Sequence, residues 1–269
     1  MRIGIVGLGL IGGSLGGALG LVGHEISGYD IAPGRQSRAL QLGWIESASP
    51  LRELAATSEV VILAAPVLRI AGLLPAVDAA APADTIIIDT GSAKGAVVEA
   101  MSICPGAHRM VGGHPLAGSE QSGPEAADPA LFRDRPFVLT PGPATDPAFL
   151  AAASALVSEA GARPVVMDAR EHDRIVAGTS HLPQILSSLL RVCVPPDSPL
   201  IGPGYLDMTR LADSDVTLWR DVLLANAAEI SGVTRRYRDR LDELLAALER
   251  EDAASIERLL GLNAAEVAP

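Results

Sequence analysis

The sequence predicts an α/β fold in which a parallel, doubly wound sheet is followed by an all-helical domain. Two observations lead to this prediction. Short runs rich in β-branched residues alternate with Ala- and Leu-rich stretches of helical length over the first two thirds of the chain. After residue 168 the strand-like runs stop and helical patterns take over. Because buried strands separated by helices are typical of parallel sheets, we expect an α/β domain at residues 1–168 and a helical domain at 169–269.

Seven runs in the first domain have the composition of buried strands. They lie at residues 2–7, 24–30, 59–66, 85–92, 109–113, 135–141 and 163–168. The segments between them that have helical length and composition lie at 10–21, 36–42, 67–80 and 147–160. This alternation favours a doubly wound sheet over one built from hairpins.

The second domain contains two long helical segments, 169–194 and 216–249, separated by the Pro- and Gly-rich connector 194–205. In the second segment the charged residues gather on one face, while Leu, Val and Ile recur at three- and four-residue spacing. A long helix with such an apolar stripe needs a partner surface to bury it. We therefore expect a homodimer that forms through these C-terminal helices.

The composition limits the choice of partners and of compartment. A formal net charge of −11 argues against nucleic acid or an anionic membrane as a partner. Cys104 and Cys193 lie far apart without metal-ligand spacing, as free thiols of a reducing compartment do. The apolar N-terminal run is rich in glycine and lacks a signal-peptide cleavage site. We expect a cytoplasmic, soluble protein that acts on a small molecule and binds no metal.

A glycine-rich turn, GLGLIG at residues 7–12, follows the first predicted strand and opens the first predicted helix. Gly7 permits the tight turn, Gly9 lets the backbone approach a pyrophosphate, and Gly12 allows the helix to pack closely on the sheet. The helix N-terminus supplies free N–H groups and a positive dipole end. The pattern predicts a Rossmann-type dinucleotide-binding domain, and the alternative is a purely structural turn.

Asp30 ends the second predicted strand, where an acidic residue accepts hydrogen bonds from the adenosine ribose. Its charge would repel a 2′-phosphate, so NAD is favoured, while Arg35 and Arg38 nearby leave room for NADP. The residues that we assign to the cofactor are Gly7, Leu8, Gly9, Leu10, Ile11, Gly12, Asp30, Pro66 and Ser92.

The densest group of polar residues is the stretch VGGHPLAGSEQSG at 111–123. Gly and Pro at this density predict a tight loop rather than a helix interior or a central strand. His114 follows a predicted strand at the carboxyl edge of the sheet, where ligands bind in open α/β folds. Since histidine accepts protons near neutral pH, His114 is the candidate base. The alternative is a loop histidine that only stabilises the turn.

Three other features could face the same crevice. Ser92 in DTGSAK follows another strand end, although it could equally cap the next helix. His181 in SHLP lies in the helical domain, where Pro183 should kink the helix, but a lone helix histidine is ordinarily structural. Asp207 could orient Arg210 toward a carboxylate if this segment is helical, and the alternative is a surface ion pair.

These segments, in this order, resemble the prephenate/arogenate dehydrogenase family of tyrosine biosynthesis. The resemblance covers nearly the whole chain, and its most specific part is the combination of GGHPLAGSE, SHLP and DMTR. The matching segments are GLGLIGGS (7–14), DTGSAK (89–94), GGHPLAGSEQSG (112–123), EHDRIVAGTSHLP (171–183) and DMTRLADSDVTLWRDVLLAN (207–226).

The resemblance implies a dehydrogenase that oxidatively decarboxylates arogenate or prephenate with NAD(P)+, giving tyrosine or 4-hydroxyphenylpyruvate. His114 would accept the proton of the ring hydroxyl while a hydride leaves the same carbon, and loss of CO2 would then aromatise the ring. Ser92 would hydrogen-bond the reacting hydroxyl or steady His114. Arg210 would bind a substrate carboxylate, with Asp207 orienting it. The remaining residues assigned to the substrate pocket are His181, Ser119, Gln184 and Glu120, the last with a gating role.

Two positions depart from the family's pattern. Leu206 replaces a basic residue that is common before the DMTR aspartate, and Gln184 replaces the second histidine of SHLPH. Both changes remove positive charge near the part of the pocket that would hold the substrate's side chain. Because a cation would repel the ammonium group of arogenate, the neutral Gln184 favours acceptance of arogenate, alongside prephenate.

Two other functions stay open. Another two-domain dehydrogenase, of the β-hydroxyacid or 6-phosphogluconate type, would rely on a lysine in its second domain, whereas Lys94 is the only lysine and lies in the first. A nucleotide-sensing module without catalysis would need the glycine-rich turn. It would have no need for His114, Ser92, His181 and Arg210 together.

Overall fold

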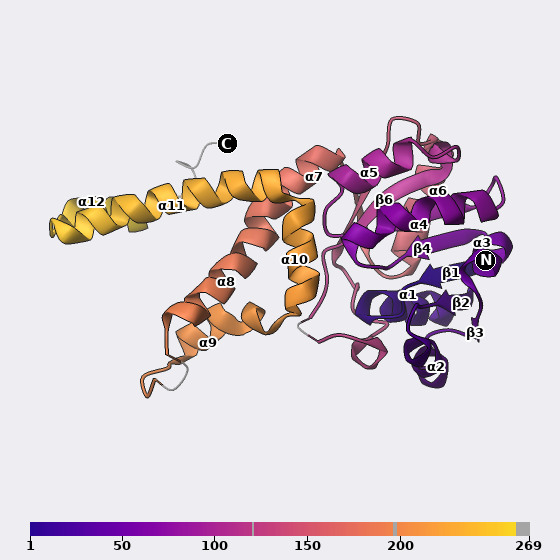
Figure 1. Ribbon diagram of the computed structural model, residues 1–269, viewed down its shortest axis with the longest axis horizontal. Coiled ribbons are helices and arrows are strands. Elements are labelled where there is room, and N and C mark those ends of the chain that lie inside the picture. Colours follow the sequence, from indigo (N-terminus) through magenta and orange to yellow (C-terminus); the bar gives the residue numbers. More distant parts are fainter. Residues whose placement is uncertain (120, 196–197, 262–269) are drawn as a thin grey trace.

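The computed structural model describes residues 1–119, 121–195 and 198–261. A sheet flanked by helices forms one part of the molecule, and a group of helices extends away from it as the other (Figure 1). The predicted fold class, an α/β domain followed by a helical one, is confirmed. In the described ranges, no helix is both long and apolar enough to cross a membrane.

The described residues form an eight-stranded sheet in the order β3-β2-β1-β4-β5-β6-β7-β8. The strands are β1 (Arg2–Val6), β2 (Glu25–Tyr29), β3 (Ser47–Ala48), β4 (Val60–Leu63), β5 (Ile86–Asp89), β6 (Met110–Pro115), β7 (Pro136–Pro141) and β8 (Arg163–Val166). Neighbours pair in parallel except β6 and β7, which are antiparallel. The expectation of an entirely parallel sheet is wrong at this pair. The link between β6 and β7 contains no crossover α-helix among its described residues, so the chain re-enters the sheet at the end where it left.

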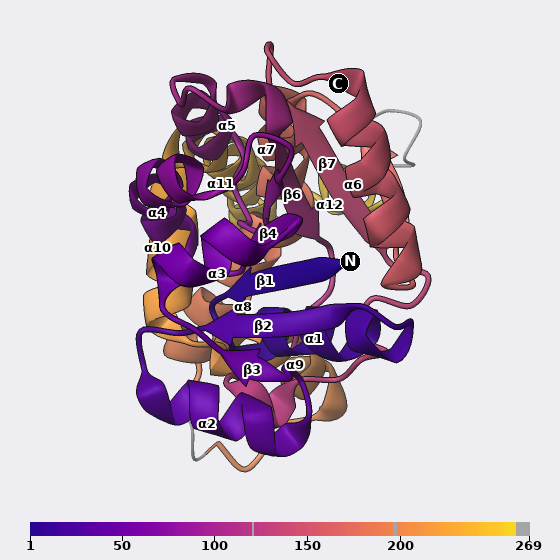
Figure 2. The same cartoon turned by 90° about the vertical axis from the view of Figure 1, so that its right-hand side faces the viewer.

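Helices cover both faces of the sheet (Figure 2). The helices of this part are α1 (Leu10–Leu21), α2 (Pro33–Leu42), α3 (Leu51–Thr57), α4 (Val67–Ala80), α5 (Gly95–Ser102) and α6 (Pro147–Glu159). Buried residues of α1, α2 and α6 belong to one apolar core, and those of α3, α4 and α5 belong to the other. The bounds of α1 and α4 agree with the prediction, whereas α3 and α5 are too short to show a helical period in the sequence.

In the second part, the described residues form helices and no strand. The helices are α7 (Ala169–Val176), α8 (Leu182–Cys193), α9 (Pro203–Thr209), α10 (Val216–Ala225), α11 (Ala227–Glu249) and α12 (Ala253–Leu260). The predicted helix 216–249 is interrupted at Asn226, between α10 and α11. Residues 169–193 are helical throughout, with a π-helical turn, Ala177–His181, between α7 and α8. Pro183 follows this turn closely, and because proline lacks an N–H it cannot donate the regular helical hydrogen bond there.

The two parts meet along α4 and α5. Helix α10 packs on α4, and α7 packs on α5. Val222 of α10 is buried in the same apolar core as α3, α4 and α5. Asp173 of α7 reaches across to α5, where its carboxylate accepts hydrogen bonds from the backbone N–H groups of Lys94 (2.7 Å) and Gly95 (2.8 Å). A residue of the helical part therefore caps a helix of the sheet-containing part.

Candidate active site

His114 lies in the sheet itself, near the carboxyl end of β6. The prediction that residues 111–123 form a loop is wrong for their first part, because β6 runs through Pro115 and pairs with both β5 and β7. The glycines of this strand permit close packing rather than a turn. A Cβ atom at Gly113 would lie 2.3 Å from the carbonyl oxygen of Asp89. The strand therefore holds His114 on a rigid element, with only 8 % of the residue exposed.

His114 begins a buried chain of hydrogen bonds that leads into the helical part. Its Nδ1 lies 2.8 Å from Nε2 of His172, and the Nδ1 of His172 lies 2.8 Å from Oδ1 of Asp173. The two imidazole rings are nearly perpendicular, at 79°. All three side chains are buried. The chain thus connects β6 with the first turns of α7.

The direction of these hydrogen bonds follows from the carboxylate at the end. An ionised carboxylate only accepts, so Nδ1 of His172 donates to Asp173. The neutral ring of His172 then offers Nε2 as an acceptor, and Nδ1 of His114 donates to it. His114 is left with an unprotonated Nε2. This atom is the one that a proton acceptor for substrate requires.

The pKa values agree with a neutral His114 and an ionised Asp173. Burial, and then the neighbouring His172 and Lys94, hold the pKa of His114 well below its usual value. Burial raises the pKa of Asp173, but hydrogen bonds from His172, Lys94 and Gly95 outweigh this and leave the pKa below the usual value. Both side chains are therefore in the states that the hydrogen-bond chain requires at neutral pH.

His181 joins the same cluster from the π-helical turn. Nδ2 of Asn226 donates to the carbonyl oxygen of Asp173 at 2.8 Å and lies 3.3 Å from Nδ1 of His181. Because an amide nitrogen only donates, Nδ1 of His181 accepts, and its Nε2 carries the proton. That buried Nε2–H has no hydrogen-bond partner, and the ring stacks edge-on against Trp219 at 6.0 Å. Burial lowers the pKa of His181 to about 4, so the side chain is a neutral donor.

Lys94 lies beneath this cluster and is fully buried. Its ammonium forms an ion pair with Asp89 at the end of β5, and it donates to the carbonyl oxygen of Gly113 at 2.7 Å. Oδ1 of Asp89 in turn accepts from the N–H of Gly113 at 2.9 Å. Burial lowers the pKa of Lys94, opposed by Asp89. The ion pair of Lys94 and Asp89 therefore links the ends of β5 and β6 directly before His114.

Ser92 follows β5 in the connection to α5 and is partly exposed. The alternative that Ser92 caps the next helix is wrong, because α5 begins at Gly95 with Lys94 in the N-cap position. Asp173 supplies the capping oxygens that the sequence suggested for Ser92. The hydroxyl of Ser92 therefore has no capping role that would compete with a function in the site.

The predicted substrate residues lie on α8, α9 and the connection after β6. Nε2 of Gln184 donates to the carbonyl oxygen of Leu211 at 2.8 Å, whereas its buried Oε1 has no partner. Asp207 lies in α9, and Arg210 follows directly in a 3₁₀ turn; both side chains are exposed. Ser119 is also exposed, and its hydroxyl accepts from the N–H of residue 121 at 3.2 Å. Glu120 lies outside the described residues.

The glycine-rich turn has the shape that a dinucleotide requires. A Cβ atom at Gly12 would lie 1.9 Å from the carbonyl oxygen of Gly7, which has a φ of +97°. A Cβ atom at Gly9, by contrast, would meet nothing within 4 Å. Gly9 is the N-cap of α1 and receives no side-chain capping bond. The open space and the uncapped helix end together fit a pyrophosphate.

The other predicted cofactor residues surround this turn. Leu8 is buried, Leu10 and Ile11 are partly exposed in the first turn of α1, and Pro66 is exposed at the N-terminus of α4. The carboxylate of Asp30 accepts from the N–H groups of Leu8 (2.8 Å) and Ala32 (2.9 Å). These bonds hold the carboxylate at the end of β2. Each of its oxygens keeps a lone pair for a ribose hydroxyl.

The sequence analysis missed four residues of this cluster. His172, Asp173 and Asn226 belong to segments that were quoted, but they were given no role, and Asp89 was regarded only as part of a strand. The adjacent His–Asp pair in EHDRIVAG was the one signal available. It could not be connected with His114, because 58 positions separate the two histidines.

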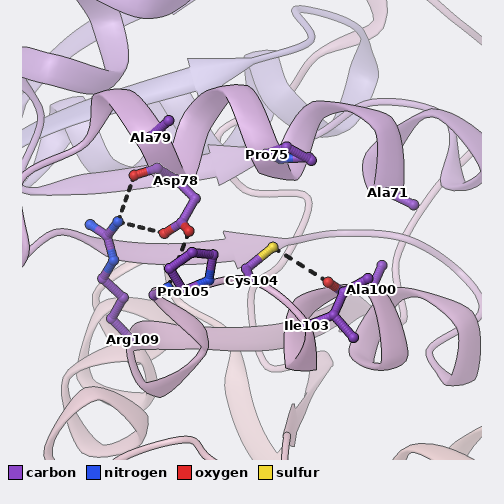
Figure 3. Close-up of a pocket in the computed structure, with 10 residues that line it drawn as sticks. Ala71, Pro75, Asp78, Ala79, Ala100, Ile103, Cys104, Pro105 and Arg109 are labelled. Atoms are coloured by element: carbon purple, nitrogen blue, oxygen red, sulfur yellow. Dashed lines mark hydrogen bonds and ion pairs between the residues drawn. The ribbon is translucent and has the colours of Figure 1, made fainter.

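A separate cavity of about 360 Å³ lies between α4 and the end of α5 (Figure 3). An ion pair between Asp78 and Arg109 (2.6 Å) closes one side of it, and Cys104 lines it. None of the residues assigned to substrate or cofactor lines this cavity.

Comparisons with known proteins agree over most of the chain. The family model for the nucleotide-binding domain of prephenate dehydrogenase matches residues 15–166, and that for its dimerization domain matches residues 168–262. The prephenate dehydrogenase of Bacillus subtilis is 33% identical over 270 aligned residues, which cover 94% of this chain and 72% of that protein.

Two solved structures have the same fold. The arogenate dehydrogenase of Synechocystis is 29% identical, with a TM-score of 0.78 over 97% of this chain and 96% of that one. The prephenate dehydrogenase of A. aeolicus, in complex with hydroxyphenyl propionate and NAD+, is 29% identical, with a TM-score of 0.88 over 97% and 95% of the two chains.

Proposed function

Because the chain belongs to the prephenate dehydrogenase family, we propose that it oxidatively decarboxylates a cyclohexadienol, arogenate or prephenate, with NAD+ as the oxidant. The products are tyrosine from arogenate and 4-hydroxyphenylpyruvate from prephenate. The observation that carries the proposal is the unprotonated Nε2 of His114, which the hydrogen bond to His172 leaves free as an acceptor.

In the proposed reaction, Nε2 of His114 accepts the proton of the ring hydroxyl. Bound NAD+ supplies the acceptor for the hydride that leaves the same carbon. The bond to the ring carboxylate then breaks, CO2 departs, and the bonding electrons complete the aromatic ring. Ser92, at the end of β5, hydrogen-bonds the reacting hydroxyl or steadies the ring of His114. Because the ring becomes aromatic, the step is effectively irreversible.

The substrate is held by donors from the helical part. Arg210 pairs with a substrate carboxylate, and Asp207, one turn earlier, orients it. His181 offers its unpartnered Nε2–H to an oxygen of the ring substituents. Because His181 is neutral, it orients the substrate without adding a cation beside the departing proton. Ser119, in the connection after β6, completes the pocket.

Gln184 supports acceptance of arogenate. Its amide nitrogen is committed to the carbonyl oxygen of Leu211, so its buried oxygen faces away from that bond without a partner. An unpaired buried acceptor is costly, and the ammonium group of arogenate is a donor that would satisfy it. Prephenate has a keto group at the same position and offers no such donor. We therefore expect both substrates to react, with arogenate preferred.

The nucleotide site supports NAD over NADP. A 2′-phosphate would approach the buried carboxylate of Asp30, whose charge repels it. Arg35 lies 3.9 Å from that carboxylate and is the nearest cation that could offset the repulsion. Lys94 cannot serve as the lysine on which dehydrogenases of the β-hydroxyacid type rely, because it is buried and paired with Asp89.

We further propose that the protein is a cytoplasmic homodimer, with the division between its two domains at Asp168. The sheet ends at Val166, and α7 begins at Ala169. The match of the helical part to a dimerization domain and the exposed leucines of α11 support the dimer. Cys104 and Cys193 are both free thiols, as is common in a reducing compartment.

One assay tests the activity and its selectivity. Purified protein is given arogenate or prephenate, each with NAD+ or NADP+, and formation of the reduced cofactor is followed. We expect the largest kcat/KM for arogenate with NAD+. Gln184→Met should move the preference toward prephenate by about tenfold, because it removes the oxygen that would accept a hydrogen bond from the ammonium group. Strict use of prephenate by the unaltered protein would contradict the assignment of Gln184.

The role of the base is tested with His114→Asn. This change should lower kcat by about two to four decades, because proton removal in the transition state is lost. The Kd for NAD+ should stay the same, since His114 lies outside the glycine-rich turn. The matched control is His108→Asn, which alters an exposed histidine of the same part of the molecule. Turnover near that of the unaltered protein would exclude His114 as the base.

A further inference from the structure

We propose that the proton accepted from substrate does not stay on His114 but passes through it to His172, where Asp173 holds it. The proposal rests on the function proposed above and extends it to two residues that do not touch the substrate. His172 and Asp173 are then positioning residues that make His114 an effective base. The juxtaposition that points to them is the buried chain from β6 to α7, with both of its hydrogen bonds 2.8 Å long.

The surroundings of His114 would not stabilise a positive charge on its ring. From β6, β5 and the helical part, the titratable groups that influence its ring are His172, Lys94 and His181, and each disfavours the protonated form. The ring is also buried, so water cannot stabilise the charge. Asp89, the nearest anion of β5, is already paired with the ammonium of Lys94. His114 alone would therefore be a weak base.

A positive charge on His172 is stabilised better than one on His114, because Nδ1 of His172 donates directly to the carboxylate of Asp173. That carboxylate is ionised and is held by two backbone N–H groups of the α5 N-terminus. Protonation of His172 changes an ordinary hydrogen bond into a charge-assisted one. The carboxylate thus stabilises the proton one residue away from the reacting atoms.

The step balances within the hydrogen-bond chain. The substrate O–H bond breaks as the lone pair on Nε2 of His114 takes the proton. The Nδ1–H bond of His114 breaks, and that proton bonds to the lone pair on Nε2 of His172. His114 ends neutral with its proton on Nε2, and His172 ends as an imidazolium beside the Asp173 carboxylate. No further oxidant or base is required, and the reverse shift restores the starting tautomers once the proton leaves to solvent.

Two variants separate proton transfer from mere orientation of His114. In His172→Gln, the side-chain oxygen still accepts from Nδ1 of His114 but cannot bind a proton. In His172→Leu, both properties are lost. If the proton moves to His172, both variants should lower kcat by at least about tenfold. The substrate KM and the Kd for NAD+ should stay within about twofold, because neither ligand touches residue 172.

The pH profile is the readout that a purely structural role would not move. In the unaltered protein, the acid limb of kcat/KM reports the coupled pair of His114 and His172. In His172→Gln, only His114 titrates, and its pKa is depressed by burial, so the limb should move to lower pH. Asp168→Asn is the matched control on α7, because the side chain of residue 168 caps that helix through the N–H groups of Arg170 and Glu171, and its only contact with His172 is through the backbone, which the substitution keeps. Its kcat and pH profile should equal those of the unaltered protein.

A titration of the imidazole rings by NMR tests the same point without turnover. On acidification, His172 should take up the first proton while His114 stays neutral, with the two signals assigned through His172→Gln. If His172→Gln keeps its kcat and its acid limb, or if His114 is protonated first, the proposal is overturned. If the unaltered protein oxidises neither arogenate nor prephenate, the proposed function fails instead. The NMR titration still decides where the proton resides.

Discussion

Three histidines of the site, His114, His172 and His181, are buried. The proposed roles of His114 and His181 depend on their staying neutral until substrate arrives. Burial lowers the pKa of both His114 and His181, and the carboxylate of Asp173 orients His172. Asn226 donates to Nδ1 of His181 and so leaves the proton of that ring on Nε2, whereas Asp173 accepts from His172 and holds the proton of that ring on Nδ1. Asp173 of α7 and Asn226, between α10 and α11, therefore decide which ring nitrogen of each histidine accepts a hydrogen bond and which donates one.

Because burial keeps His181 neutral, the folded protein should lose stability in acid, and this loss can be measured. Its pKa is about 4 in the folded protein and near 6.5 when unfolded, so between these values only the unfolded chain binds the proton. The free energy of unfolding should therefore fall as the pH is lowered from about 6.5 to about 4, by at most about 3 kcal/mol from this residue. Urea denaturation of the unaltered protein and of His181→Gln at pH 7 and at pH 4.5 measures the difference.

The variant should lose less stability than the unaltered protein between the two pH values. His108→Gln serves as the control, since an exposed histidine should leave the pH dependence unchanged. Equal pH dependence in His181→Gln and in the unaltered protein would show that His181 is not held neutral by burial.

At the scale of elements, β1 and α1 form the nucleotide turn through two different uses of glycine. Gly12 is required by the fold, because a Cβ atom there would lie 1.9 Å from the Gly7 carbonyl oxygen. Gly9 is not, since the space around its Cβ position is open and its φ of −87° suits any residue. The open space at Gly9 is thus free for a ligand. We therefore expect substitution by alanine to have different effects at Gly9 and at Gly12.

Gly9→Ala should fold normally and bind NAD+ at least about tenfold more weakly, because the added methyl occupies the place of the pyrophosphate. Gly12→Ala should unfold at a clearly lower temperature, whatever its ligand. Gly34→Ala is the control, as its Cβ atom in α2 would also meet nothing within 4 Å. Thermal unfolding and calorimetric titration with NAD+ measure both properties. Unchanged NAD+ affinity in Gly9→Ala would refute the placement of the cofactor.

At the scale of the whole molecule, α11 projects from the rest of the protein (Figure 1). It carries an apolar stripe. The stripe consists of Tyr237, Leu241, Leu245 and Leu248, whose spacing places them on one helix face. They are 41%, 51%, 54% and 54% exposed in the single chain. Such a row of exposed leucines is typical of a surface that a second copy covers.

A double variant tests this assembly. Leu241→Glu with Leu245→Glu should convert the dimer into a monomer, because two charges would have to be buried in the interface. Size-exclusion chromatography with light scattering measures the mass. Asp239→Lys changes the charge on the opposite face of α11 and should remain dimeric. A monomeric unaltered protein, or a dimer that survives both glutamates, would contradict the proposed interface.

Much of the fold could be predicted because it depends on local patterns. The glycine-rich turn, the bounds of α1 and α4, and the change from strands to helices near residue 168 are all determined by neighbouring residues. The antiparallel β6–β7 pair could not be predicted, since strand direction depends on where a long connection leads. A strand was predicted at residues 109–113, but its continuation through His114 and Pro115 was not, because Gly and Pro at this density are typical of loops. The glycines are explained by close contacts with β5 and β7, which the local sequence does not show.

The sequence by itself determined the family, the nucleotide fold and the candidate for the base, because GLGLIG, GGHPLAGSE, SHLP and DMTR are contiguous motifs that can be recognised without a structure. Only the tertiary structure decided which contacts would allow His114 to act as the proposed base. It joined His114 to His172 and Asp173, capped α5 with a carboxylate from α7, and left one nitrogen of His181 unpartnered. Tautomers, burial and pKa values arise from contacts between residues that are far apart in the chain. No spacing within the chain encodes them.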